Sequence, residues 1–397
     1  MYSCTKDEQP KLIETQKACW EIDDWTGLLT DSLMLTEEEP SIPEVDPAYV
    51  EWLSDKNNRV DIRSLTSENF EDLQCLKQYI GDRTIVQLGE SSHGTKEYNL
   101  MKVRLIKFLH QEMGFEVIAF ESGFFECYYS YLHLKEHDPE VFMKQSIYTI
   151  WCCEATLELF DYLNKAQHMD PPLILAGFDC QQSGSSLLSR SDELIKMIGS
   201  IDSTYAKEVA EYDNWFLNNG INDSNYLEAN EDLIRTTYAN LILFIDINID
   251  EIKSNYPQKA YFPEFVKQSI SSTIAYADEM RAYYQNNKKE MRQIRDSAMA
   301  RNVSYLKNTL FPGKRIILWA HNVHINHDLD YNYEYGRRMG SWLYEKYSND
   351  IYTIGLYMLR GKQNRKMLIF KSLMLYYQLN QIALKQSFIM SEKNIFY

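Results

Sequence analysis

Residues 84–94 read TIVQLGESSHG, a short apolar run that ends in a glycine and a cluster of polar residues. The apolar positions are nearly continuous, whereas a strand with one wet face would alternate apolar and polar residues. Such continuity is typical of a strand buried on both faces, as in a parallel sheet covered by helices. The stretch therefore predicts a parallel sheet with polar chemistry at the end of this strand.

Four further runs of the same kind follow along the chain. They are Val117–Phe120, Leu173–Ala176, Arg315–Ala320 and Ile351–Leu356. Amphipathic stretches such as 98–111 and 156–166 separate the runs with the periodicity of helices. This alternation predicts an α/β fold with a mostly parallel central sheet flanked by helices.

The predicted organisation has an insertion in the α/β core. Residues 185–310 are charged, rich in Tyr, Asn and Ile and poor in glycine and proline, and their apolar periodicity predicts long helices. We expect them to form a helical lobe between the two parts of the core, at 61–184 and 311–360. Residues 1–60, acidic and proline-containing, are expected to form an irregular leader, and residues 361–397 a tail.

Composition limits the class of partner. The 397 residues carry 41 basic and 57 acidic side chains, and the resulting net charge of −16 repels nucleic acid and anionic membranes. No stretch approaches the roughly 20 apolar residues of a membrane span, and the N-terminus lacks the features of a secretory signal. Seven scattered cysteines without a CxxC pair favour a reducing compartment. We therefore expect a cytoplasmic protein with no nucleic-acid or membrane partner, its oligomeric state unknown.

Each of the first four predicted strands ends in a polar cluster. In strand order, the residues are Glu90 and His93, then Glu121, then Asp179 and Gln181, then His321 and His324. Because the carboxyl ends of parallel strands share one edge, where ligands bind, these side chains should converge. Imidazole transfers protons near neutral pH, and three of the eight histidines lie within 321–327. The pattern predicts an enzyme site at this edge.

Six motifs in order resemble those of the erythromycin esterase family. They are LGESSHG at 88–94 with Glu97 and Lys102, AFE at 119–121, Trp151 with Glu154, GFDCQ at 177–181, RDSAMARN at 295–302 and WAHNVH at 319–324. The resemblance implies a cofactor-free hydrolase that cleaves an ester with an activated water and no covalent acyl-enzyme. It also implies a macrocyclic lactone of the macrolide type as substrate, and hence antibiotic resistance. The tail at 361–397 departs from the family's pattern.

The resemblance also implies roles for individual residues. The positions that match the family's catalytic set are His93 as general base, Glu90, Glu121, His321 and His324. Lys102 matches a basic position on the first helix. The predicted substrate-binding residues are Lys102, Asp179, Gln181 and Arg295. No metal site is predicted.

Ester hydrolysis needs a base for water, donors for the oxyanion and an acid for the leaving alkoxide. A carboxylate that accepts from the other ring nitrogen of His93 would fix its tautomer. Glu90 and Glu121 are both candidates for this position, and the sequence does not choose between them. The candidate oxyanion donors are His321, His324, Lys102 and, more weakly, Arg295.

Three alternative hypotheses stay open. A serine hydrolase would require a G-x-S-x-G elbow, which the sequence lacks. A metal-dependent hydrolase could use the same glutamates and histidines, because two histidines and a carboxylate can hold zinc or iron, although no helical H-E-x-x-H motif is present. A protein linked to polysaccharide biosynthesis, of the succinoglycan type, could bind a ligand in the same cleft without esterase activity.

Overall fold

The computed structural model describes residues 62–327 and 336–357. The predicted leader at 1–60 and the predicted tail at 361–397 lie outside these ranges. Strands and helices alternate up to residue 179 and again from residue 316, with a run of helices between them. Over the described ranges, no helix combines the length and the apolar composition needed to cross a bilayer.

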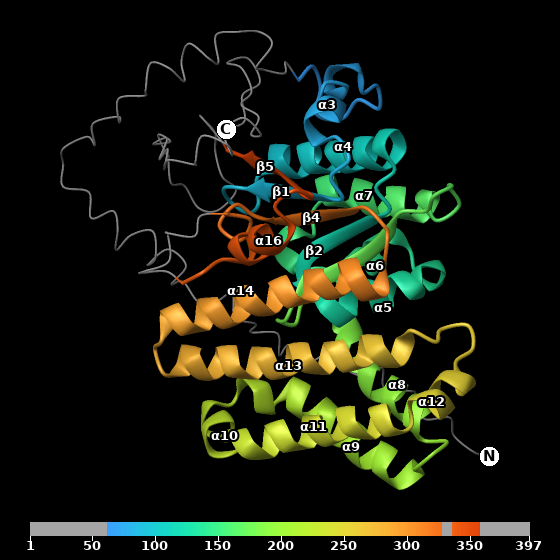
Figure 1. Ribbon diagram of the computed structural model, residues 1–397, viewed down its shortest axis with the longest axis vertical. Helices are drawn as coiled ribbons and strands as arrows, with labels where there is room; N and C mark the ends of the chain where they lie inside the picture. Colours follow the sequence, from blue (N-terminus) through green and yellow to red (C-terminus); the bar gives the residue numbers. More distant parts are fainter. Residues whose placement is uncertain (1–61, 328–335, 358–397) are drawn as a thin grey trace, which may run out of the picture. The chain divides into compact units, whose positions relative to one another are not determined.

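The centre of the fold is a five-stranded parallel sheet (Figure 1). Its strands are β1 (Ile85–Glu90), β2 (Val117–Gly123), β3 (Ile174–Asp179), β4 (Ile316–His321) and β5 (Ile351–Leu356). Their order across the sheet is β3-β2-β4-β1-β5, so β4 lies between β1 and β2 and pairs with both. Every residue of β1 and β2 is buried, which confirms the prediction of strands covered on both faces.

Alternate residues of each strand enter two separate hydrophobic cores. Val86 and Ile317 belong to the first core, and Ile85 and Ile316, their neighbours along the strands, belong to the second. The helices that form the first core with the sheet are α3 (Leu76–Ile80), α4 (Lys96–Met113), α6 (Pro139–Ser146) and α7 (Glu154–Ala166). The second core is completed by α5 (Phe124–Leu132), by α16 (Met339–Tyr347) and by the helices of the insertion.

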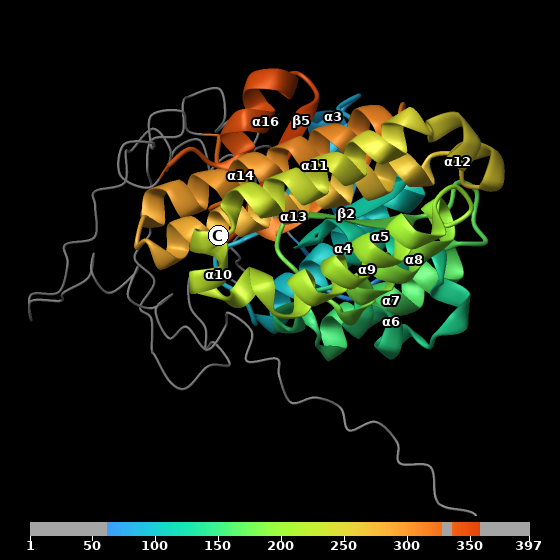
Figure 2. The same ribbon diagram turned by 90° about the horizontal axis from the view of Figure 1, so that it is seen from below.

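The insertion between β3 and β4 is the predicted helical lobe. Its helices are α8 (Ser189–Ile198), α9 (Ser203–Asn218), α10 (Ser224–Ala229), α11 (Glu231–Ile247), α12 (Ile249–Asn255), α13 (Phe262–Tyr284) and α14 (Lys288–Tyr305), which continues into a π-helical turn (Leu306–Leu310). Side-chain caps begin several of them, as where Asp202 accepts hydrogen bonds from two backbone N–H groups of α9. Helices α13 and α14 run side by side, and α14 packs against β3 (Figures 1 and 2).

A buried ion pair joins three helices of the lobe. The guanidinium of Arg190 on α8 donates to both carboxylate oxygens of Asp213 on α9, at 3.1 and 2.6 Å. It also donates to the hydroxyls of Ser269 and Thr273 on α13, at 2.7 and 2.9 Å. Each charged group of the pair has hydrogen-bond partners, so no buried charge is left unpaired in the apolar core. The pair therefore holds the three helices in one arrangement.

Candidate active site

The carboxyl ends of four strands meet at one edge of the sheet. Glu90 and His321 are register partners at the ends of β1 and β4. Glu121 lies in β2, beside a register irregularity between Phe120 and Gly123, and irregularities of this kind change the direction in which a strand's side chains point. The Glu121 carboxylate accepts a hydrogen bond from the backbone N–H of His321 at 2.8 Å. The structure thus brings together residues that lie 200 positions apart in the chain.

The Glu90 carboxylate is buried and satisfied by three donors. It accepts from Nδ1 of His93 at 2.8 Å, from Nε1 of Trp151 at 2.8 Å and from Nζ of Lys102 at 3.0 Å. Burial by itself would raise the pKa of Glu90, but Lys102 and His93, with the Trp151 hydrogen bond, outweigh it and hold the pKa at about 2. The carboxylate is therefore charged at every pH at which the protein is expected to work.

His93 lies in the loop between β1 and α4, and 32% of its side chain is exposed. Gly94 follows with a φ of +75°, a left-handed conformation that allows the sharp turn into α4. Since the Glu90 carboxylate can only accept, Nδ1 of His93 carries a proton, and in the neutral ring the lone pair is on Nε2. The ring centroid lies 5.1 Å from that of His321, a spacing at which one water can contact both rings.

The pKa values of His321 and His324, both near the end of β4, are shifted in opposite directions. The backbone N–H of Val323 donates to Nδ1 of His321 at 3.1 Å. Burial, with His93 and His324 nearby, lowers the pKa of His321 to about 3, so this ring is neutral at pH 7. For His324, burial would also lower the pKa, but Asp296 and Glu121 outweigh it and raise the pKa above its usual value.

Lys102 is placed behind Glu90 and away from the exposed side of the site. Its ammonium group is fully buried, and besides Glu90 it donates to the backbone carbonyl of Ala320 at 3.0 Å. It also lies 4.6 Å from the ring centroid of Trp319, a cation–π contact. Burial lowers its pKa, and Glu90 partly restores it. Two of its three N–H donors are thus used within the protein, and its role toward an oxyanion or a substrate stays a prediction.

Arg295 connects the second and third strand ends. It donates to both oxygens of Asp179, from Nε at 3.2 and 3.1 Å, and to Oε1 of Glu121 at 3.1 Å. Asp179 is fully buried and so belongs to the interior of the site. Asp179 and Arg295, each predicted to bind substrate, are thus paired with each other, and Arg295 also contacts Glu121; their role toward a substrate stays a prediction.

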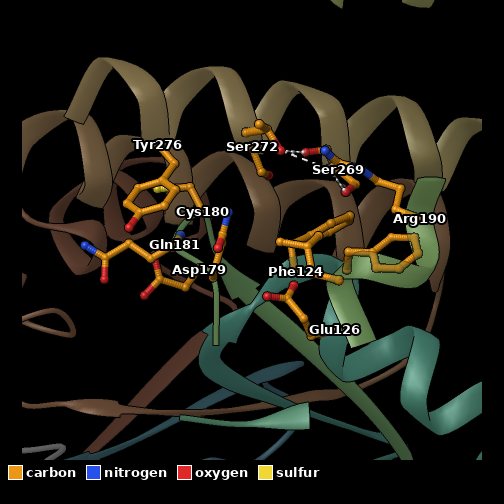
Figure 3. A pocket seen from close by; sticks show the side chains of 13 residues that line it. Phe124, Glu126, Asp179, Cys180, Gln181, Arg190, Ser269, Ser272 and Tyr276 are labelled. Atoms are coloured by element: carbon orange, nitrogen blue, oxygen red, sulfur yellow. Dashed lines mark hydrogen bonds between the residues drawn. The ribbon is translucent and has the colours of Figure 1, made fainter. Parts of the chain in front are cut away.

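Gln181 is partly exposed and lies where β3 meets α13 (Figure 3). Its amide donates to Glu279 of α13 at 2.5 Å, and Tyr148 donates to its carbonyl oxygen at 3.2 Å. Burial raises the pKa of Glu279 to about 8. The cavity drawn in Figure 3 has a volume of about 10 Å³, roughly that of one water, so it is too small for a group of a substrate.

Two residues of the site could not be chosen by residue type. Trp151 orients Glu90, although a tryptophan is ordinary core material. Asp296 accepts from Nδ1 of His324 at 2.8 Å, although an aspartate beside an arginine on a helix is usually a solvated ion pair. The available signal was their place in the motifs at 151–154 and 295–302.

A metal-dependent hydrolase would need side chains of the site to be arranged as ligands of a metal ion. Within 62–327 and 336–357, no group of three or more His, Cys, Asp or Glu side chains is arranged to bind a metal ion. The carboxylates of Glu90 and Glu121 are instead occupied by nitrogen donors of the protein. The metal-dependent alternative gains no support from this geometry.

Comparison with known proteins gives a consistent result. The family model described as erythromycin esterase matches residues 110–371. The Bacillus subtilis (strain 168) protein YbfO, named as a hydrolase, is 34% identical over 312 residues, which cover 73% of this chain and 68% of that protein. Erythromycin esterase type II of Escherichia coli is 31% identical over 144 residues, 35% of this chain and 33% of that one.

A solved structure extends the likeness to the fold. It is that of a mutant of the erythromycin esterase EreC in its open conformation. The two chains superpose with a TM-score of 0.57 at 19% sequence identity, and the match covers 75% of this chain and 76% of the other. The α/β architecture with its inserted helices is therefore shared.

Proposed function

The chain belongs to the erythromycin esterase family and is a hydrolase of the esterase type, and we propose that His93 activates the attacking water without a covalent intermediate. The observation that carries this proposal is the hydrogen bond between His93 and the buried Glu90 carboxylate. It places the lone pair of the neutral imidazole on Nε2, the nitrogen that must accept a proton from water. Lys102 and Trp151 support the reaction indirectly, because they hold Glu90 charged and in place.

The reaction then proceeds by addition and collapse. Nε2 of His93 takes one proton of the water while its oxygen adds to the ester carbonyl carbon. The tetrahedral intermediate carries a negative charge, and we assign its stabilisation to the ring of His324, whose pKa Asp296 and Glu121 raise against the effect of burial. Expulsion of the alkoxide gives the carboxylate and the alcohol, and the protein is left without an acyl group.

For the substrate, we propose a carboxylic ester of the macrocyclic lactone class, as in the macrolides. The support is the similarity to a protein named erythromycin esterase type II. The free state of the five described cysteines, Cys75, Cys127, Cys152, Cys153 and Cys180, suits the cytoplasmic location that we propose with it. On this proposal, expression of the protein in a macrolide-sensitive strain raises the inhibitory concentration of a macrolide that it hydrolyses.

The test is His93→Ala in the full chain, assayed against a panel of macrocyclic lactones and simple acyl esters. We expect hydrolysis to fall at least about 100-fold because the base is lost, while the melting temperature stays near that of the wild type because the ring is partly exposed. His133→Ala is the matched control, since His133 caps the far end of α5 and contacts Tyr129. Its activity should be unchanged.

The outcomes separate the competing functions. Covalent labelling of the wild type by a fluorophosphonate would favour a serine nucleophile, and loss of activity on treatment with a chelator would favour a metal. Tight binding of a polysaccharide without turnover of any ester would contradict the proposed hydrolysis. Full activity of His93→Ala would contradict the role given to His93.

A further inference from the structure

A second imidazole–carboxylate pair lies opposite the first. Asp296 on α14 is fully buried, and its Oδ1 accepts from Nδ1 of His324 at 2.8 Å and from the backbone N–H of Met339 at 2.8 Å. Its Oδ2 accepts from the guanidinium of Arg338 at 3.3 Å. Three donors thus fix this carboxylate, just as three donors fix Glu90.

The surroundings of His324 differ from those of His93 in one respect. His324 lies between two carboxylates, because its Nε2 is 3.3 Å from Oε1 of Glu121 while its Nδ1 faces Asp296. An imidazole can donate from both nitrogens only as the cation. The other charged or titratable groups that face it are Arg295 of α14, Arg338 before α16, and His321 of β4.

We propose that Asp296 is a positioning residue that keeps His324 as an imidazolium, and that this imidazolium protonates the leaving alkoxide of the ester. This inference rests on the proposed function. It assigns the two pairs opposite tasks: the first accepts a proton from water, and the second gives one to the alcohol.

The proton count closes over one cycle. His93 gains a proton from water as the C–O bond to the attacking oxygen forms. His324 loses its Nε2 proton as the C–O bond to the leaving group breaks and the O–H bond of the alcohol forms. At the end of the reaction, His93 carries one extra proton and the carboxylic acid product releases another. One of these two protons restores His324 and the other passes to solvent.

Esters with different leaving groups distinguish the proposed role of Asp296 from a merely structural one. An alkyl alkoxide is strongly basic and departs much faster when it receives a proton, whereas a p-nitrophenolate is a weak base and gains little from an acid. Loss of the acid therefore slows cleavage of alkyl esters selectively, while general distortion of the site slows both kinds of ester.

The experiment compares Asp296→Asn with the wild type on alkyl and p-nitrophenyl esters of one acid. We expect kcat/KM to fall about 100- to 10,000-fold for the alkyl ester and less than about 10-fold for the p-nitrophenyl ester. The basic limb of the pH profile should move to lower pH, because Asp296 no longer favours the cationic ring. Asp213→Asn is the matched control, since it removes an equally buried aspartate of the helical lobe that is ion-paired with Arg190 and not with His324 or Glu121, and it should leave the ratio of the two rates unchanged.

His324→Gln keeps the inference testable if Asp296→Asn does not fold. The amide retains polar contacts in the same space but cannot act as an acid, so the same selective loss is expected. In the double variant, Asp296→Asn should add no further loss, because the aspartate acts through the histidine. Equal slowing of both esters in either variant would overturn the inference, whereas a wild type that cleaves neither ester would contradict the proposed function itself.

Discussion

An exposed carboxylate is hydrogen-bonded by water. The buried carboxylate of Glu90 is hydrogen-bonded instead by the ammonium of Lys102, the indole N–H of Trp151 and the imidazole N–H of His93. Burial of such a group is tolerated only while protein donors or water satisfy its oxygens. The same carboxylate sets the tautomer of His93, so Glu90 affects both the stability of the fold and the proposed proton transfer. Glu90 and His93 are only three residues apart, and the turn that contains Gly94 makes their contact local.

Replacement of Glu90 by glutamine tests this link. The amide can present its NH₂ group to Nδ1 of His93, which favours the tautomer with the proton on Nε2 and removes the base. We expect kcat/KM to fall about 100- to 10,000-fold. Glu154→Gln, in the motif that contains Trp151, is the control, because Glu154 is 90% exposed and its partner Lys96 is 3.7 Å away. Steady-state kinetics would check both; similar losses in the two variants would contradict the role of Glu90.

For individual residues, the sequence indicated which side chains belong to the candidate site but not which partner each of them contacts. The choice between Glu90 and Glu121 as the partner of His93 stayed open because the direction of Glu121 depends on an irregular strand register. The place of Lys102 also could not be predicted, since its partner carbonyl on Ala320 lies 218 residues away. Only the folded chain determines which nitrogen faces which oxygen.

Among the elements, the end of β2 limits the geometry of the site most tightly. Glu121 lies in this strand, and β3 passes beside it without a side chain at Gly177. A Cβ on Gly177 would lie 2.2 Å from the carbonyl oxygen of Gly123 and 2.5 Å from that of Ser122. These are backbone atoms, so they can give way only if the strand end moves.

Gly177→Ala should therefore destabilise the fold by about 1–3 kcal/mol, the usual cost of overpacking. It should also lower activity, because the strand end that carries Glu121 is displaced. Gly355→Ala in β5 is the matched control: there the new Cβ would meet the side chain of Tyr357 at 3.1 Å, a contact that the ring can relieve. Denaturant unfolding and esterase assays would check the pair. Equal stability of the two variants would contradict the argument.

The elements themselves were largely predictable because burial on both faces leaves a continuous apolar signal. The fifth strand has the predicted bounds, Ile351–Leu356. The third is shifted, from Leu173–Ala176 to Ile174–Asp179, because Gly177 and Asp179, which interrupt the apolar run, pair with β2 nonetheless. In the same way Glu121, predicted to follow the second strand, lies within it.

At the scale of the whole molecule, two partly buried histidines contribute to the response of stability to acid. Burial lowers the pKa of His327 to about 4 and, with neighbouring histidines, that of His321 to about 3. The unfolded chain, with histidine pKa values near 6.5, binds more protons than the folded one between those limits. The stabilisation is therefore complete above about pH 6.5 and is lost as the pH falls toward 3 to 4.

We expect the melting temperature to fall steadily as the pH is lowered from about 6.5 to 4, with a shallower fall in His327→Gln. His327 contacts the hydroxyl of Thr353 at 2.9 Å and stacks on Tyr344, and glutamine can keep the first contact without titrating. Calorimetry over this pH range would check the slopes. His133→Gln, a change at a half-buried ring on α5, should leave the slope as in the wild type; an unchanged slope in His327→Gln would contradict the assignment.

The strand order was not predictable from the sequence, since local periodicity does not say which strands become neighbours. Here β4, the fourth strand in chain order, lies in the middle of the sheet. Strands β1 and β2 touch only through β4, which follows them after the whole lobe. During translation, the ribosome therefore releases the first half of the protein with two apolar strand edges that have no partner until residues 316–321 emerge. Since those residues include His321 and His324 follows three positions later, the nascent chain shields these strand edges and gains these two histidines of the candidate site in the same step.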